Sequence, residues 1–153
     1  MKQIHPYSLW LGHADDGANT QQILNAGIQA VVQLAVEVPP LQPYRELIYC
    51  RFPLLDGPGN DPTLLRLTSE TLVRLLRRQV PTLVCCGGGM CRSPALAALA
   101  LAQVHAVSPE NALEQIARQH PTDLSPAFWQ EVRGLLPSAI PAGQASRTAV
   151  PES

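Results

Sequence analysis

The chain of 153 residues contains no apolar stretch long enough to cross a membrane. Its N-terminus also lacks a charged start followed by an apolar segment, the pattern of a secretory signal. We therefore expect a cytoplasmic protein. Only 15% of the residues are charged and the formal net charge is -1, so the sequence has no broad basic surface of the kind that binds nucleic acids and anionic lipids. We expect neither a nucleic-acid partner nor a membrane partner. We also expect the protein to be a monomer.

The four cysteines do not form the pattern of an extracellular disulfide framework, because Cys85, Cys86 and Cys91 lie within seven positions. Adjacent cysteines also lack the usual spacing of metal ligands, and no histidine pair completes a metal-binding set. We therefore expect no metal and no other cofactor. The four scattered histidines are interpreted as surface or partly buried residues. The cysteine pattern favours thiol chemistry instead.

A glycine-rich loop separates an apolar run from a helix-forming one. Residues 81–85 favour a buried strand, and residues 94–104 are rich in Ala and Leu, with Pro94 where the first helical turn tolerates it. The residues between these segments are Cys86, Gly87, Gly88, Gly89, Met90, Cys91, Arg92 and Ser93. Glycines allow positive φ, so the backbone N–H groups from Gly87 to Arg92 can converge on one anion at the helix N-terminus. The pattern predicts a phosphate-binding loop.

Two side chains of the loop point to chemistry as well as binding. The guanidinium of Arg92 presents a planar pair of donors that matches two phosphate oxygens. The positive field of the loop favours a thiolate on Cys86, and the thiolate is the nucleophilic form of cysteine. Cys86 is therefore a candidate covalent catalyst. The alternative is a plain buried turn between the strand and the helix.

This stretch resembles the signature loop of the cysteine-dependent protein tyrosine phosphatases, in particular the small dual-specificity branch, whose pattern is His-Cys-x-x-Gly-x-x-Arg-Ser/Thr. The resemblance implies that Cys86 is the nucleophile, Gly89 the fixed glycine and Arg92 the phosphate clamp. It also implies that the Ser93 hydroxyl stabilises the departing thiolate. Cys85 departs from the pattern, because it stands where the family has a histidine that helps to activate the nucleophile.

The resemblance also implies a general acid about thirty residues before the nucleophile. Residues 45–52 favour a strand, and Asp56 follows it at the start of a Gly/Pro-rich stretch suited to a mobile acid. The alternative is that Asp56 forms a turn. For Asp61 we expect a structural role, as a turn residue or as the cap of a helix over residues 63–79.

The resemblance covers residues 7–136 and implies an α/β fold: three layers, with a central, mostly parallel sheet of four or five strands flanked by helices. Gly27 is expected to end the first helix, before a second strand. Further helices are expected over residues 108–118 and 125–135. Residues 1–136 would form the catalytic domain. Residues 137–153, rich in Pro, Ala, Ser and Gly, are expected to form a flexible tail.

The resemblance implies a metal-independent phosphatase that hydrolyses phosphate monoesters through a phosphocysteine, with phosphotyrosine, phosphoserine or phosphothreonine of proteins as substrate. A nonprotein substrate, such as a phosphorylated metabolite or an RNA 5′ end, is an alternative. A catalytically weak phosphate-binding module is another. Cys50, Cys85 or Cys91 could also form a reversible disulfide with Cys86, or Cys50 and Cys85 could be small buried hydrophobic residues.

Overall fold

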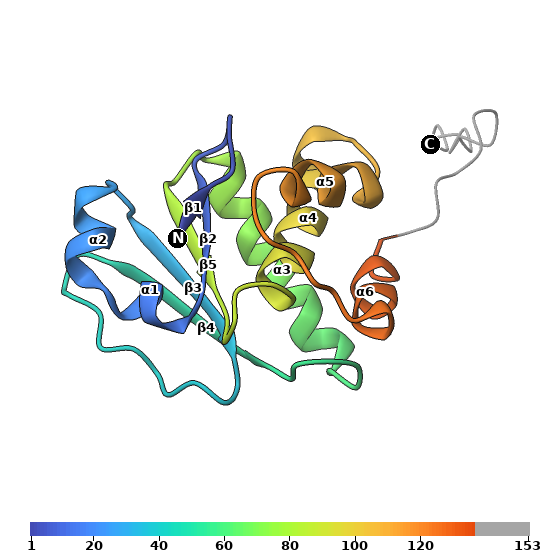
Figure 1. Ribbon diagram of the computed structural model, residues 1–153, viewed down its shortest axis with the longest axis horizontal. Helices are drawn as coiled ribbons and strands as arrows, with labels where there is room; N and C mark the ends of the chain where they lie inside the picture. The colour runs from blue at the N-terminus through green and yellow to red at the C-terminus, as the bar shows by residue number, and fades with distance from the viewer. Residues whose placement is uncertain (137–153) are drawn as a thin grey trace, which may run out of the picture.

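A mixed sheet of five strands forms the centre of the computed structural model, which describes residues 1–136 (Figure 1). In their order across the sheet, the strands are β1 (Lys2–Gln3), β2 (Leu9–Gly12), β5 (Thr82–Cys85), β3 (Ala30–Ala35) and β4 (Ile48–Leu54). β1 is antiparallel to β2, and the other neighbouring pairs among the described residues are parallel. The expected mostly parallel sheet is thus confirmed. The expected tail of residues 137–153 lies outside the described residues.

Helices cover both faces of the sheet, which confirms the three-layer α/β architecture. One face carries α1 (Ala14–Ala18) and α2 (Thr20–Asn25), and the other side holds α3 (Pro62–Arg77), α4 (Arg92–His105), α5 (Pro109–Ala117) and α6 (Pro126–Arg133) (Figure 1). No helix within residues 1–136 has both the length and the apolar character needed to span a membrane.

Local sequence signals set the ends of several helices. Asp61 caps α3, because its side chain accepts a hydrogen bond from the Thr63 N–H at 2.9 Å, and this confirms its expected structural role. Ser108 caps α5 in the same way. Gly27, with a φ of +72°, turns the chain after α2, because that left-handed conformation is easily adopted by glycine. These ends explain why the chain switches between helix and strand at these points.

The starts of β4 and α4 differ most from those expected. β4 begins at Ile48 rather than at residue 45, because the preceding residues form a turn in which the Leu47 N–H donates to the Tyr44 carbonyl. α4 begins at Arg92, two residues before Pro94. Proline fits this third helical position because a helix leaves its first N–H groups without intrahelical partners. The earlier start places Arg92 in the first turn of the helix.

α4 is the central helix of the larger core. All of residues 95–102 are buried, and the alternating alanines let the helix pack closely between the sheet and its neighbouring helices. Each fully buried leucine, such as Leu96 or Leu99, stabilises the fold by roughly 1.5–3 kcal/mol. This packing fixes the N-terminus of α4 beside the carboxyl end of β5, and the glycine-rich loop joins these two points.

Candidate active site

The glycine-rich loop can adopt its shape only with glycine at position 89. Gly89 has a φ of +77°, and a Cβ at this position would lie 2.8 Å from both the carbonyl carbon and oxygen of Gly12. A side chain would therefore combine backbone strain with a collision against rigid backbone. Gly89 folds the loop back over the end of β2, and its N–H group turns toward the start of the loop.

Cys86 lies at the base of this loop and is buried. Its Sγ atom accepts a hydrogen bond from the Gly89 N–H at 3.2 Å. The Cys86 N–H faces the Gly12 carbonyl at 3.4 Å. A backbone N–H directed at sulfur interacts more strongly with a thiolate than with a neutral thiol. One backbone donor of the loop thus faces the Cys86 sulfur, and the role of Cys86 as nucleophile stays a prediction.

Arg92 is buried, and its guanidinium is held in place by Glu37, which follows β3, and by Leu54 at the end of β4. Nη1 donates to Glu37 Oε2 at 2.7 Å and to the Leu54 carbonyl at 2.9 Å, while Nη2 donates to Glu37 Oε1. A guanidinium has five N–H donors, so three bonds leave two. They are the Nε hydrogen, which has no hydrogen-bond partner among the described residues, and one Nη2 hydrogen on the same edge. Arg92 therefore keeps a two-donor edge that matches two phosphate oxygens.

The Arg92–Glu37 pair changes the acidity of both groups. The hydrogen bond from Arg92 lowers the pKa of Glu37, although partial burial opposes the shift. Burial alone would lower the pKa of Arg92, but the bond to Glu37 and the negative charges around it raise the pKa instead. Both groups are consequently charged throughout the neutral range, and the guanidinium keeps a fixed orientation.

Asp56 lies next to the free edge of Arg92. Its Oδ1 atom is 3.9 Å from Arg92 Nε, and its side chain is 65% exposed. The turn that carries Asp56 is held by Asn60, whose side chain accepts from the Leu55 N–H at 2.8 Å and donates to the Leu55 and Gly57 carbonyls. An exposed carboxyl beside the phosphate-binding edge can reach the leaving oxygen of a substrate.

A cavity of about 440 Å³ brings most of the expected site residues together. It is lined by Asp56, Cys86, Gly88, Gly89, Met90, Cys91, Arg92, Asp123, Leu124, Ser125 and Pro126. Gly87 and Ser93 do not line it. Ser93 is fully buried in the first turn of α4, and its Oγ atom has no hydrogen-bond partner among the described residues. The role expected for Ser93 stays a prediction.

Comparisons with known proteins identify the fold. Human DUSP28 superposes with a TM-score of 0.78 at 24% identity, over 88% of this chain and 94% of that chain. A mouse putative dual specificity phosphatase gives a TM-score of 0.77 at 24% identity, over 88% and 84% of the two chains. The fold is that of the dual-specificity phosphatases.

The human tyrosine phosphatase-like serine/threonine/tyrosine-interacting protein has the same dual-specificity phosphatase fold. It gives a TM-score of 0.74 at 17% identity, over 88% of this chain and 93% of that chain. No protein-family model and no curated protein matches the sequence. The similarity is therefore one of fold, and the activity has to be argued from the site.

Cys85, which departs from the phosphatase pattern, faces away from the cavity. Its Sγ atom packs against α1, where a Cβ on Gly17 would approach it to 2.8 Å. It belongs to an apolar cluster with Ile23 and Leu83, whereas Cys86 belongs to the core on the other face. Burial raises the pKa of the Cys85 thiol to about 12. All four cysteines are free thiols, and Cys85 is the small buried hydrophobic residue of our alternative interpretation.

The sequence did not predict three parts of the site: Glu37, Asn60 and the segment of residues 120–125. Glu37 had one usable signal, since it follows a buried parallel strand, and ligand sites of parallel sheets lie at such carboxyl ends. Asn60 and the 120–125 segment had none, because turns rich in Asn, Pro and Ser are common in loops. Within residues 1–136 no group of three His, Cys, Asp or Glu residues could hold a metal ion.

Proposed function

We propose that this chain is a cysteine-dependent phosphatase that hydrolyses phosphate monoesters through a phosphocysteine on Cys86. One observation carries the proposal. The Cys86 sulfur, the Nε edge of Arg92 and the Asp56 carboxyl converge in a single cavity at the N-terminus of α4. A nucleophile, a phosphate clamp and a proton donor are the groups that this reaction requires.

In the first step, the backbone N–H groups of residues 87–92 and the free edge of Arg92 bind the phosphate oxygens. The Cys86 thiolate attacks phosphorus opposite the ester oxygen, so an S–P bond forms while the P–O bond breaks. Asp56 gives its proton to the departing oxygen. The alcohol or phenol leaves, and the phosphoryl group remains on sulfur.

In the second step, water attacks the phosphocysteine. Asp56, now a carboxylate, takes a proton from this water, the new P–O bond forms, and the S–P bond breaks. Inorganic phosphate and the Cys86 thiolate result, and the Ser93 hydroxyl stabilises the released thiolate. Arg92, the loop amides and the helix dipole supply the positive field for both steps.

Phosphorylated proteins are the substrates that we propose, with phosphotyrosine, phosphoserine and phosphothreonine as the reacting groups. The charged residues among those lining the cavity are Asp56, Arg92 and Asp123, so carboxylates outnumber cations there. This balance disfavours substrates with several phosphates, which need more cations. Comparing phosphopeptides with a phosphorylated metabolite and a 5′-phosphorylated RNA by kcat/KM separates the protein substrate from the nonprotein alternatives.

The reaction itself is tested by hydrolysis of para-nitrophenyl phosphate by the reduced protein in EDTA. We expect turnover that EDTA does not reduce and that Cys86→Ser abolishes, because serine at this position lacks the readily formed thiolate. Cys85→Ser is the matched control and keeps activity, since Cys85 faces α1. Binding of phosphate without turnover at any pH would instead identify the phosphate-binding module, and turnover by Cys86→Ser would exclude the phosphocysteine.

The monomeric state and the cytoplasmic location belong to the same proposal. Light scattering of the purified full chain gives the first, and fractionation of cells that express it gives the second. A dimer that persists on dilution, or recovery with membranes, would contradict them.

A further inference from the structure

Three carbonyl groups of the glycine-rich loop have hydrogen-bond partners from other segments. The Gly87 carbonyl accepts from the Ala14 N–H at 3.1 Å, and the Met90 carbonyl accepts from the Asp123 N–H at 2.8 Å. The Gly89 carbonyl lies 2.8 Å from His120 Nε2. A carbonyl only accepts, so Nε2 carries the hydrogen in this bond.

These bonds fix the direction of the N–H groups that face the substrate. In a trans peptide the C=O and the following N–H point in opposite directions within one plane. Holding the Gly89 carbonyl outward therefore directs the Met90 N–H inward. The bonds at Gly87 and Met90 do the same for the N–H groups of Gly88 and Cys91.

The His120 bond differs from the other two because a side chain makes it, and because it is made to a glycine. Gly89 has a φ of +77° and no Cβ, so the peptide between Gly89 and Met90 can rotate at low cost. A rotated peptide would turn its carbonyl toward the phosphate and repel it. His120 Nε2 stabilises the orientation that binds an anion.

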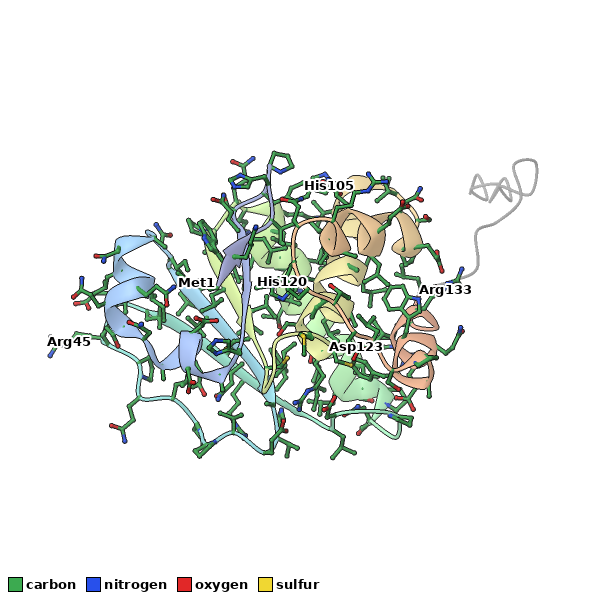
Figure 2. All side chains as sticks on the ribbon, viewed as in Figure 1. Met1, Arg45, His105, His120, Asp123 and Arg133 are labelled. Carbon is green, nitrogen blue, oxygen red and sulfur yellow. The ribbon has the colours of Figure 1, made fainter. Side chains whose placement is uncertain are left out.

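His120 is itself held by a segment that is anchored to the site. Residues 120–125 join α5 to α6, and Figure 2 labels His120 and Asp123 on this segment. The His120 N–H donates to the Ile116 carbonyl at the end of α5. Ser125 begins α6 as its cap. Burial raises the pKa of the Cys91 thiol, and the backbone of Ser125 lowers this pKa to a smaller extent. The 120–125 segment thus spans the loop from two fixed helices and also forms part of the cavity wall.

We propose that His120 is a positioning residue for phosphate: its Nε2–H orients the peptide between Gly89 and Met90 so that the Met90 N–H faces the bound phosphoryl group. This inference rests on the proposed function. His120 touches neither substrate nor the reacting sulfur, and it acts through the loop backbone. Its Nδ1 atom is buried and has no hydrogen-bond partner among the described residues, which fits a ring that carries its hydrogen on Nε2.

The test compares inorganic phosphate binding by full-length Cys86→Ser protein, alone and with a second substitution, using calorimetry. His120→Leu removes the donor, whereas His120→Gln places an amide N–H at a similar reach. Loss of one preorganised donor in an oxyanion site costs about a hundredfold or more, so partial disorder of one N–H is expected to weaken phosphate binding about tenfold. His120→Gln is expected to restore most of the phosphate binding. The control is His105→Leu, which is expected to leave phosphate binding unchanged because the His105 ring stacks on Tyr7, away from the cavity.

Equal phosphate binding by the Leu variant and its parent would overturn the role of His120, as would a Gln variant no better than Leu at equal unfolding free energy. Absence of phosphate binding to the Cys86→Ser protein itself would overturn the proposed function instead. A second measurement needs no substitution at position 120. Nitrogen NMR of the histidine rings is expected to show a hydrogen on Nε2 of His120. A His120 ring without a hydrogen on Nε2 would contradict the bond to Gly89.

Discussion

At the scale of single residues, the Arg92–Glu37 pair explains how a buried guanidinium remains ready for phosphate. Glu37 occupies the end of the guanidinium, and the adjacent edge stays free. Arginine alone could not be assigned this orientation from the sequence, because its partner lies 55 positions away. Lysine could not replace it, since an ammonium lacks the planar fork that serves a carboxylate and a phosphate together.

The pair also predicts a pH dependence of stability. The pKa of Glu37 is lowered by Arg92, so the pair contributes fully above the ordinary value of 4.5 and its contribution is lost as the pH falls through the lower folded value. Because Glu37 is half exposed, we expect Glu37→Gln to reduce the unfolding free energy by about 0.5–1 kcal/mol at neutral pH. Denaturant unfolding of both proteins at several pH values measures this difference.

The difference between the two proteins should shrink below pH 4.5, where Glu37 binds a proton in the unfolded parent before it does so in the folded parent. The control is Glu114→Gln, which breaks an exposed pair with Arg118 on α5, far from Arg92 in the sequence. A difference that stays the same from neutral pH to well below 4.5 would contradict the assignment.

At the scale of elements, the turn between β4 and α3 determines where the general acid lies. Asn60 is buried and makes three hydrogen bonds that close this turn around Asp56. Asn60→Ala leaves these backbone groups without their partner, so we expect the unfolding free energy to fall by about 1–3 kcal/mol. We also expect a lower kcat, because Asp56 is no longer held beside the leaving oxygen.

Substrates with different leaving groups separate a loss of stability from a loss of acid positioning. Phenyl phosphate releases a more basic oxygen than para-nitrophenyl phosphate and depends more on a proton donor. The kcat of Asn60→Ala should therefore fall more for phenyl phosphate, with Asp56→Asn showing the same pattern more strongly. Asn25→Ala on α2 serves as the control, since the Asn25 side chain bonds only to the exposed side chain of Gln21 among the described residues. An equal loss for both substrates would mean that Asn60 does not position the acid.

The elements also show why part of the site could be predicted from the sequence. β5, the glycine-rich loop and α4 follow one another directly, so local patterns were enough to place Cys86, Gly89 and Arg92. Asp56 required the family resemblance, and its proximity to Arg92 agrees with it. His120 was interpreted only as a surface or partly buried residue, because its partner Gly89 lies 31 positions away and no local pattern encodes such a contact.

At the scale of the whole molecule, the parallel sheet gathers the site from distant parts of the chain. β2, β5, β3 and β4 all run in the same direction, so their carboxyl ends meet at one edge. Gly12, Cys86, Glu37 and Asp56 lie at or just after these four ends. The fold class therefore accounts for a site whose members are scattered over the sequence.

The central claim is that the phosphoryl group passes through the Cys86 sulfur. Its most direct test uses para-nitrophenyl phosphate with radiolabelled phosphorus, a rapid quench in denaturant during turnover, and peptide mapping of the labelled protein. The account predicts a label on Cys86, none on the neighbouring Cys85 or Cys91, and no labelled protein after Cys86→Ser. Sustained turnover without label on Cys86, or a label on another residue such as Ser93, would contradict it.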